Sequence, residues 1–344
     1  MKLEIVNPVD YPQWDEMVLA TDDYSFFHSS SWANVLSASY NYKPAYFALI
    51  KHGKLLAALP IMEVRSFLTG SRGVSLSFSD YCEPLIEDKE YFKVLLDAVI
   101  SHGKKSDWKH IELRGGQKFL SGKPESAKYF GHALLLSKND QELLSGFRDS
   151  TRRNIKKAFH AGVETKICTT LQSVGEYYRL HCMTRKRHCL PPQPLDFFRN
   201  IYDYIISKNR GFVVLATYDN TTVAGAIYFH FGNRALYKFG ASDDAYQHTR
   251  ANNLVMWEAI RWYAHNGYLT FCFGRSDCDG EGLRQFKKGW GTVERNINYY
   301  KYDIGEDKFI NTIDAEKSNC TMLLGKMPKP ILQLTGQLLY RHMG

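Results

Sequence analysis

A strand, a glycine-rich loop and a short basic helix follow one another in Phe271-Cys-Phe-Gly-Arg-Ser-Asp-Cys-Asp-Gly-Glu-Gly-Leu-Arg-Gln-Phe-Lys-Lys-Gly-Trp-Gly291. The apolar run from Leu269 to Phe273 is typical of a buried strand, and the glycines after it allow backbone conformations that a Cβ would exclude. The next helical turn is predicted to place Leu283 and Phe286 inward. Loops after strand ends commonly bind ligands in α/β folds, so the stretch predicts a site. The alternative is a glycine-rich connection before a solvated basic helix.

The composition is that of a globular protein with more than one domain. A length of 344 residues predicts two domains, each of about 150 residues. Lys and Arg exceed Asp and Glu by 44 to 36, giving a formal net charge of +8. This charge favours anionic partners such as nucleic acid, phosphorylated metabolites or acidic lipid head groups, and does not choose among them.

The cysteines and the apolar segments indicate a cytoplasmic protein. There are seven cysteines and no Cys-x-x-Cys pair, which is typical of reduced thiols. The first residues lack the apolar core of a secretion signal, and no stretch approaches the roughly 18 apolar residues of a membrane span. The pairs His181-Cys182 and His188-Cys189 flank one predicted helix among arginines, and no further pair completes a tetrahedral set. No metal site is therefore predicted.

The first part of the chain is predicted to be an α+β layer built on hairpins. Strands are expected at Tyr46–Lys51 and Leu55–Val64, joined through His52-Gly53-Lys54, with a helix from Tyr91 to His102. Near Leu134 the pattern of elements restarts.

A strongly basic helix opens the second part. The segment from Arg148 to Lys157 holds five cations and one anion. Its buried stripe is expected to consist of Ile155, Ala158 and Phe159. The remaining face is either a solvated charged surface or a phosphate- or RNA-binding site formed by Arg152, Arg153 and Lys156.

A three-strand meander follows at Phe212–Tyr218, Val223–Phe231 and Ala235–Ala241, and then a helix from Ala251 to Asn266. Helix, meander, helix, strand and loop is the order of an N-acetyltransferase-like (GNAT) fold, and the chain runs through a similar order twice. The predicted fold class is therefore α+β with two tandem GNAT-like domains. The first covers residues 1–135 and is completed by the tail 305–344, and the second covers residues 136–304.

Four motifs are Arg152-Arg-Asn-Ile-Lys-Lys-Ala158, Thr184-x-x-Arg187 before Leu190-Pro191, Phe273-Gly274-Arg275, and Gly282-Leu283-x-x-Phe286-Lys287-x-x-Trp290-Gly291. Together they resemble the FemABX peptidoglycan-bridge aminoacyltransferases and, more closely, exopolysaccharide-associated relatives of that group. The resemblance covers most of the second half and, more weakly, the first half and the tail. It implies a double acyltransferase fold that binds a cell-wall precursor and admits an acyl donor, typically aminoacyl-tRNA.

The resemblance also implies roles for single residues. Phe286 and Lys287 look like the family's pair at the reaction centre. Arg187 and Tyr237 look like its ligands for a diphosphate-sugar acceptor, and a loop in the first domain resembles one that reaches the cleft. The residues predicted to bind substrate are Arg187, Tyr237, Arg185, Asp80, Tyr81 and Arg275.

Acyl transfer from an ester or thioester to an amine forms a tetrahedral oxyanion, which a fixed cation such as Lys287 stabilises by on the order of 3 kcal/mol. The alternative is that Lys287 is a surface lysine. Acetyl-CoA transferases carry a glycine-rich pyrophosphate cradle where this chain has Gln247-His-Thr-Arg250-Ala-Asn252. Without glycine, Arg250 and Asn252 are expected to crowd the backbone amides, which disfavours ordinary CoA binding.

These features predict an acyl- or aminoacyltransferase that forms an amide on a peptidoglycan or exopolysaccharide precursor. No permanently bound cofactor is expected, and the acyl donor is either aminoacyl-tRNA or acyl-CoA. The expected partners are a sugar- or lipid-linked envelope precursor and tRNA. One alternative is an acyl-CoA-dependent N-acyltransferase of exopolysaccharide biosynthesis, and another is a non-catalytic RNA- or phosphoglycan-binding module.

The tail carries an apolar helix from Ile331 to Tyr340, with cations at its ends. It is expected either to dock on the first domain or to form an interfacial helix that contacts the inner face of a membrane.

Overall fold

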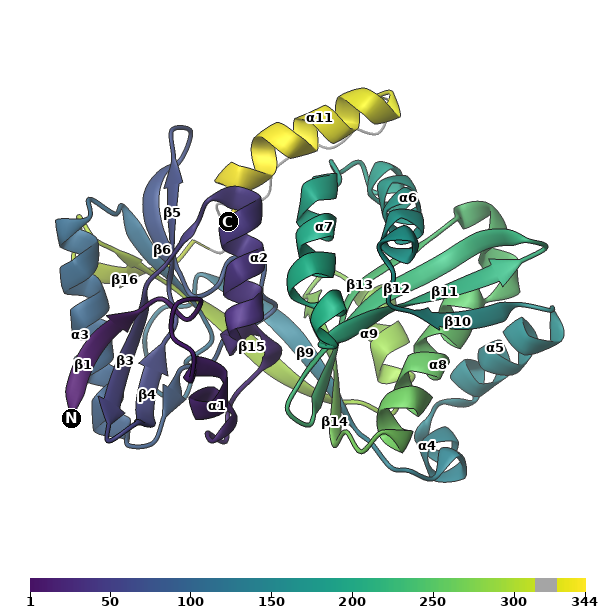
Figure 1. Cartoon of the computed structure of the whole chain (residues 1–344), viewed down its shortest axis with the longest axis horizontal. Helices are drawn as coiled ribbons and strands as arrows, with labels where there is room; N and C mark the ends of the chain where they lie inside the picture. The colour runs from purple at the N-terminus through teal and green to yellow at the C-terminus, as the bar shows by residue number, and fades with distance from the viewer. Residues whose placement is uncertain (313–326) are drawn as a thin grey trace. The chain divides into compact units, whose positions relative to one another are not determined.

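The computed structural model describes residues 1–312 and 327–344 (Figure 1). The chain divides into two compact units. Unit 1 comprises Met1–Tyr129, the described part of Asn296–Lys317, and Leu339–Gly344. Unit 2 comprises Phe130–Arg295 and the described part of Ser318–Leu338. Strands β9 (Ala127–Leu135) and β15 (Val293–Asp303) contain residues of both units.

Unit 1 is built on two runs of strands. The first is an antiparallel sheet in the order β1 (Lys2–Val6), β3 (Tyr46–Lys51), β4 (Lys54–Leu59) and β7 (Leu85–Ile86). The second runs from β15 through β8 (His110–Arg114), β6 (Gly70–Val74) and β5 (Met62–Ser66) to β2 (Lys43–Pro44), with β16 (Lys308–Ile310) on β15. Its helices are α1 (Trp14–Leu19), η1 (Phe26–His28), α2 (Ser30–Tyr40), α3 (Lys89–Lys105) and η4 (Tyr340–His342).

The hairpin predicted at His52-Gly53 joins β3 to β4, but the single strand predicted from Leu55 to Val64 is wrong. It consists of β4 and β5, which belong to different runs of strands, with Pro60 between them. Proline has no N–H to donate to a ladder, so the strand ends there.

Unit 2 is built on five strands in the order β10 (Glu164–Cys168), β11 (Gly211–Tyr218), β12 (Thr221–Phe231), β13 (Arg234–Ser242) and β14 (Thr270–Asp277). All neighbours are antiparallel except β13 and β14. The meander predicted from the short connections is therefore confirmed. The helices are α4 (Asp140–Gly146), α5 (Asp149–His160), α6 (Leu171–Arg187), α7 (Leu195–Tyr204), η2 (Ile206–Lys208), η3 (Asp244–Thr249), α8 (Ala251–His265), α9 (Glu281–Lys288) and α11 (Lys329–Leu339).

Helices cover both faces of the unit 2 sheet (Figure 1). Alternate residues of β11, Phe212 and Val214, share one core with α5 and α8. On the other face, Leu180 of α6 lies over Gly225 of β12, 3.6 Å from where a Cβ would stand. Phe159 was predicted to be buried in this arrangement and is 70% exposed. The buried stripe of α5 is Thr151, Ile155 and Ala158, and Phe159 lies one residue further round the helix.

The parallel pair at the end of this sheet separates. Strands β13 and β14 pair over three positions, Arg234–Leu236 with Thr270–Cys272. Both strands continue past this register, β13 to Ser242 and β14 to Asp277.

The tail contacts both units through different residues. Leu332 and Gly336 on one side of α11 are buried, and a Cβ on Gly336 would stand 2.0 Å from the Pro192 carbonyl oxygen of unit 2. After Leu339, Tyr340 and His342 are buried in unit 1. Among the described helices, none combines the length and the apolar character of a membrane span.

Candidate active site

Lys287 is buried, with 2% of its surface exposed. It lies on α9, and its Nζ donates a hydrogen bond of 2.6 Å to the backbone oxygen of Arg275 on β14. A buried ammonium requires such a partner because leaving water is costly for a charge. The side chain is therefore held at a defined place, and it is not the surface lysine of the alternative interpretation.

Phe286 packs inward beside it. Its ring contacts the ring of buried Trp290 edge-on, with 6.0 Å between the centroids. Leu283, which was also predicted to face inward, is 48% exposed. Of the two, only Phe286 packs against the core of unit 2.

Close contacts with the backbone explain why glycine is needed after α9. Gly291 has a φ of 68°, and a Cβ on it would stand 2.6 Å from the Gly146 carbonyl oxygen. The N–H of Arg148 donates to the Gly289 carbonyl oxygen at 2.9 Å. The end of α9 therefore lies directly against the start of the basic helix α5.

A small pocket of about 150 Å³ lies beside Phe286 at the N-terminus of α8. Its walls come from β12, the end of β13, η3 and the first turn of α8. They are Val223, Ala224, Ser242, Asp243, Tyr246, Gln247, Arg250, Ala251, Asn252, Asn253 and Phe286.

The turn before α8 forms without glycine because Arg250 itself adopts a left-handed conformation, with a φ of 62°. The Asn252 side chain turns toward β13 and donates to Ser242 Oγ at 3.1 Å. The pocket therefore opens onto the first backbone amides of a 15-residue helix, whose dipole favours an anion or a carbonyl oxygen.

A cluster next to Lys287 was not predicted from the sequence. Glu294 on β15 accepts hydrogen bonds from Arg284 at 2.6 and 2.7 Å, from Lys288 at 3.1 Å, and from His132 Nε2 of β9 at 3.0 Å. The Arg284 guanidinium also lies 3.7 Å above the centre of the Phe130 ring. Glu294 therefore links Arg284 and Lys288 of α9 to strands β9 and β15.

The charges of this cluster follow from its contacts. Arg284 and then Lys288 lower the pKa of Glu294 to about 2 by hydrogen bonding to its carboxylate. Burial and the nearby Lys287 ammonium lower the pKa of His132. A neutral His132 donates to Glu294 through Nε2–H, so Nδ1 carries the lone pair. That Nδ1 is buried and has no hydrogen-bond partner among the described residues.

The predicted substrate ligands of unit 2 lie on α6, β13 and β14. Arg187, at the end of α6, forms an ion pair of 2.8 Å with Asp244 of η3. Arg185 Nε donates to the Pro191 carbonyl oxygen at 3.1 Å, which ties down the loop after α6. Arg275 contributes its backbone oxygen to Lys287.

Tyr237 sits at a bulge, where the register between β12 and β13 shifts beside Tyr228. Burial raises the pKa of Tyr237 to about 12, so it is a neutral hydrogen-bonding group. The Tyr237 hydroxyl lies close to Gly240. A Cβ added to Gly240 would stand 1.9 Å from the hydroxyl oxygen.

This contact yields a test of Tyr237. Gly240→Ala should force the Tyr237 ring out of its place, and we expect an increase of about tenfold in KM for the acceptor, comparable to the loss of one positioned hydrogen bond. Gly175→Ala on α6 is the matched control, because a Cβ there meets nothing within 4 Å. An unchanged KM in Gly240→Ala would remove Tyr237 from the site.

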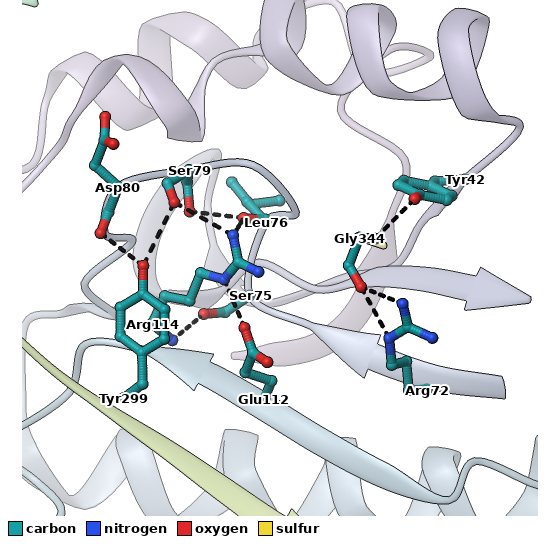
Figure 2. Close-up of polar contacts among 10 residues, drawn as sticks. All are labelled: Tyr42, Arg72, Ser75, Leu76, Ser79, Asp80, Glu112, Arg114, Tyr299 and Gly344. Atoms are coloured by element: carbon teal, nitrogen blue, oxygen red, sulfur yellow. Dashed lines mark hydrogen bonds and ion pairs between the residues drawn. The ribbon is translucent and has the colours of Figure 1, made fainter. Parts of the chain in front are cut away.

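Asp80 and Tyr81 lie in unit 1, in the loop from β6 to β7. Tyr299 donates to the Asp80 backbone oxygen at 2.8 Å, and Arg114 donates to the backbone oxygens of Leu76 and Ser79 (Figure 2). The Asp80 carboxylate points away from these bonds (Figure 2).

The same loop holds Leu76 and Phe78 at φ values of 60° and 58°. Left-handed conformations are rare for bulky residues and cluster at functional sites. The loop is thus held in a strained conformation by its contacts with Arg114 and Tyr299.

The basic face of α5 is exposed at Arg153 and Lys156, whereas Arg152 is paired with Asp149. The exposed Phe159 ring belongs to the same helix. The face therefore offers cations and an aromatic surface together.

The first His-Cys pair, His181 and Cys182, has structural partners. His181 is buried, its Nε2 contacts Gln193 Oε1 at 2.7 Å, and burial lowers its pKa to about 3. Cys182 Sγ accepts a hydrogen bond from Gln333 of α11. In the described ranges, no three His, Cys, Asp or Glu side chains are grouped to hold a metal ion.

Comparison with known proteins agrees with this geometry. A family model described as an acetyltransferase (GNAT) domain matches residues 145–288. This part of the chain is therefore similar to a GNAT domain. The matched residues contain α5 to α9, the pocket and Lys287.

Part of the sequence is similar to lipid II:glycine glycyltransferases. Over 94 residues, or 26% of the chain, the sequence is 30% identical to the lipid II:glycine glycyltransferase of Staphylococcus epidermidis and 29% identical to that of Staphylococcus aureus. The match spans 21% of the length of these relatives.

Solved structures extend the similarity beyond the GNAT domain. FemX aligns with a TM-score of 0.69 at 16% identity, over 87% of this chain and 97% of FemX. A tandem GNAT protein of the clavulanic acid biosynthesis pathway aligns with a TM-score of 0.55 at 12% identity, over 88% of this chain and 99% of that protein. The predicted tandem GNAT-like fold and the FemABX-like resemblance are confirmed.

Proposed function

We propose that this chain transfers an acyl or aminoacyl group to an amine of a cell-envelope precursor. The observation that carries the proposal is the buried Lys287, which is fixed to β14 and directly follows Phe286, a residue that lines the pocket. A fixed cation beside a pocket at a helix N-terminus suits stabilisation of a tetrahedral oxyanion. The similarity to lipid II:glycine glycyltransferases supports the choice of acceptor.

In the proposed reaction the acceptor amine attacks the ester carbonyl carbon of the donor. The C–N bond forms, the C–O bond to the donor hydroxyl breaks, and the proton lost by the nitrogen is balanced by the one that the leaving oxygen gains. Lys287 stabilises the negative charge on the carbonyl oxygen, and holding both substrates together lowers the barrier further.

The pocket is proposed to hold the acyl end of the donor. Its volume of about 150 Å³ is below the usual range of roughly 300–1,000 Å³ for pockets that enclose whole ligands. It therefore suits a small acyl or aminoacyl group, with the rest of the donor outside. The exposed cations of α5 and the Phe159 ring would serve an RNA donor, because cations follow a nucleic-acid backbone and aromatic rings stack on bases.

The acceptor is proposed to bind to unit 2 through Arg187 and Tyr237. Arginine suits a diphosphate because its planar donors match phosphate oxygens. In this scheme the phosphate would replace Asp244 as the partner of Arg187.

A donor comparison tests the proposal. Purified protein is incubated with lipid II as acceptor and with either glycyl-tRNA or acetyl-CoA as donor, and mass spectrometry follows amide formation. We expect a product from glycyl-tRNA, with transfer weakened by Arg153→Glu and Lys156→Glu and by rising salt.

The other outcomes separate the alternatives. Micromolar binding of acetyl-CoA in moderate salt, with acetyl transfer, would favour the acyl-CoA-dependent enzyme, which the acetyltransferase description of the GNAT domain also supports. If tRNA binds but no donor gives turnover, the result would support the remaining hypothesis, a non-catalytic RNA-binding module.

A further inference from the structure

The residues after α11 are fixed to the β5–β6 hairpin of unit 1. Arg72 of β6 donates to the backbone oxygens of His342 and Gly344, each at 2.8 Å (Figure 2 shows the bonds to Gly344). His342 Nδ1 lies 3.0 Å from Ser66 Oγ. Tyr42 donates to the Tyr340 backbone oxygen at 3.2 Å. The hairpin and residues 339–344 therefore form one surface.

Large apolar side chains are exposed on this surface. Phe67 and Leu68, in the turn of the hairpin, are 87% and 57% exposed, and Met343 is 57% exposed. The Phe67 ring contacts the ring of His342, with 4.6 Å between the centroids. Turns are normally made of polar residues and glycine. We call Phe67, Leu68, Leu339 and Met343 the hairpin patch.

The helix that leads into the patch has an apolar face of its own. Ile331, Leu334 and Leu338 follow one another at helical spacing on α11, and each is at least 51% exposed. The opposite side of α11 is already packed through Leu332 and Gly336. The contacts of α11 within unit 2 therefore leave Ile331, Leu334 and Leu338 uncovered.

The charges around these residues favour an anionic partner. Residues 64–74 and 327–344 contain four Lys or Arg and neither Asp nor Glu. Of the four, Arg65, Lys329 and Arg341 are exposed, and Arg65 is paired with Glu63. A second copy of the chain would bring the same cationic segments together in a two-fold contact, which is repulsive. Anionic lipid head groups attract the cations, and the acyl region accepts the apolar side chains.

We propose that the hairpin patch inserts into the surface of an anionic lipid bilayer. Phe67 and Leu68 enter the boundary between head groups and acyl chains, and Arg341 contacts lipid phosphates. This inference does not depend on acyl transfer. If the proposed acceptor is lipid-linked, the same contact brings the enzyme to its substrate.

Vesicle flotation of the full chain tests the inference, with phosphatidylcholine vesicles made with and without phosphatidylglycerol. We expect flotation with the anionic vesicles and at least a tenfold loss of bound protein in Phe67→Ser/Leu68→Ser. Both side chains are exposed, so the circular dichroism spectrum should stay unchanged. Arg341→Glu should weaken binding to anionic vesicles only.

Phe159→Ser is the matched control, because it removes another exposed aromatic ring beside cations, outside the patch. It should float like the unaltered chain. Equal flotation of Phe67→Ser/Leu68→Ser would mean that net charge alone binds the vesicles and would overturn the inference. Failure to float with any vesicle, or a dimer in sedimentation that the double substitution dissociates, would overturn it too.

Discussion

Lys287→Met should lower turnover by about a hundredfold to a thousandfold, which is the usual cost of removing one donor to a developing oxyanion. Methionine has nearly the same length as lysine, so it fills the same buried space without the ammonium. It leaves the Arg275 carbonyl oxygen without the hydrogen bond from Nζ, but it also removes the cost of a buried charge. These two effects oppose each other, and we expect the melting temperature to change by only a few degrees.

The measurement is kcat with the donor and acceptor that support transfer, together with thermal unfolding. Lys208→Met is the control, because Lys208 is an exposed lysine on η2, and it should keep full turnover. A Lys287→Met protein that is folded and turns over at the unaltered rate would disprove the role of Lys287. Loss of membrane binding would leave this result unchanged when the acceptor is supplied in detergent, so the two proposals fail separately.

Glu294→Gln should lower kcat by about tenfold to a hundredfold by loosening α9, since small displacements of a positioned group are costly. Glutamine keeps the shape of the side chain but removes the negative charge that holds Arg284 and Lys288. His132 would then face a neutral amide, and Arg284 and Lys288 would lack their carboxylate partner. KM should change less than kcat, because the proposed substrate ligands lie elsewhere.

The same substitution should change the stability in acid. The pKa of Glu294 in the folded protein is about 2, below its ordinary value of 4.5. Its contribution to the free energy of unfolding is therefore present above pH 4.5 and is lost as the pH falls toward 2. Glu294→Gln should lack this part of the acid dependence in thermal unfolding from pH 5 to about pH 2.

Glu306→Gln is the control, because Glu306 pairs with Lys308 at 2.8 Å on an exposed surface, where ion pairs contribute little. It should leave kcat unaltered. If Glu294→Gln had the kcat and the acid profile of the unaltered chain, the cluster would have no part in holding α9.

Local patterns predicted the meander, the helix after it and the strand–loop–helix of the candidate site. They succeeded because alternation, helical spacing and glycine turns act over a few residues. The family resemblance of a motif on one short helix also singled out Phe286 and Lys287 as candidate site residues, and their role stays a prediction. The burial of Lys287 could not be predicted, because the Arg275 oxygen that accepts its hydrogen bond lies on another element.

Tertiary contacts decided the remaining features. His132 and Glu294 are 162 residues apart, and neither stands in a pattern that marks a site. Phe159 was assigned to the core from helical spacing, but the way α5 packs on α8 leaves it in solvent. Phe67 lies 275 residues before His342, and only folding places the two rings in contact. Sequence alone determined which local elements form and which of them carries Lys287, since those depend on neighbouring residues. Folding alone decided which charges surround that lysine and which apolar residues face solvent, since both depend on contacts between distant segments.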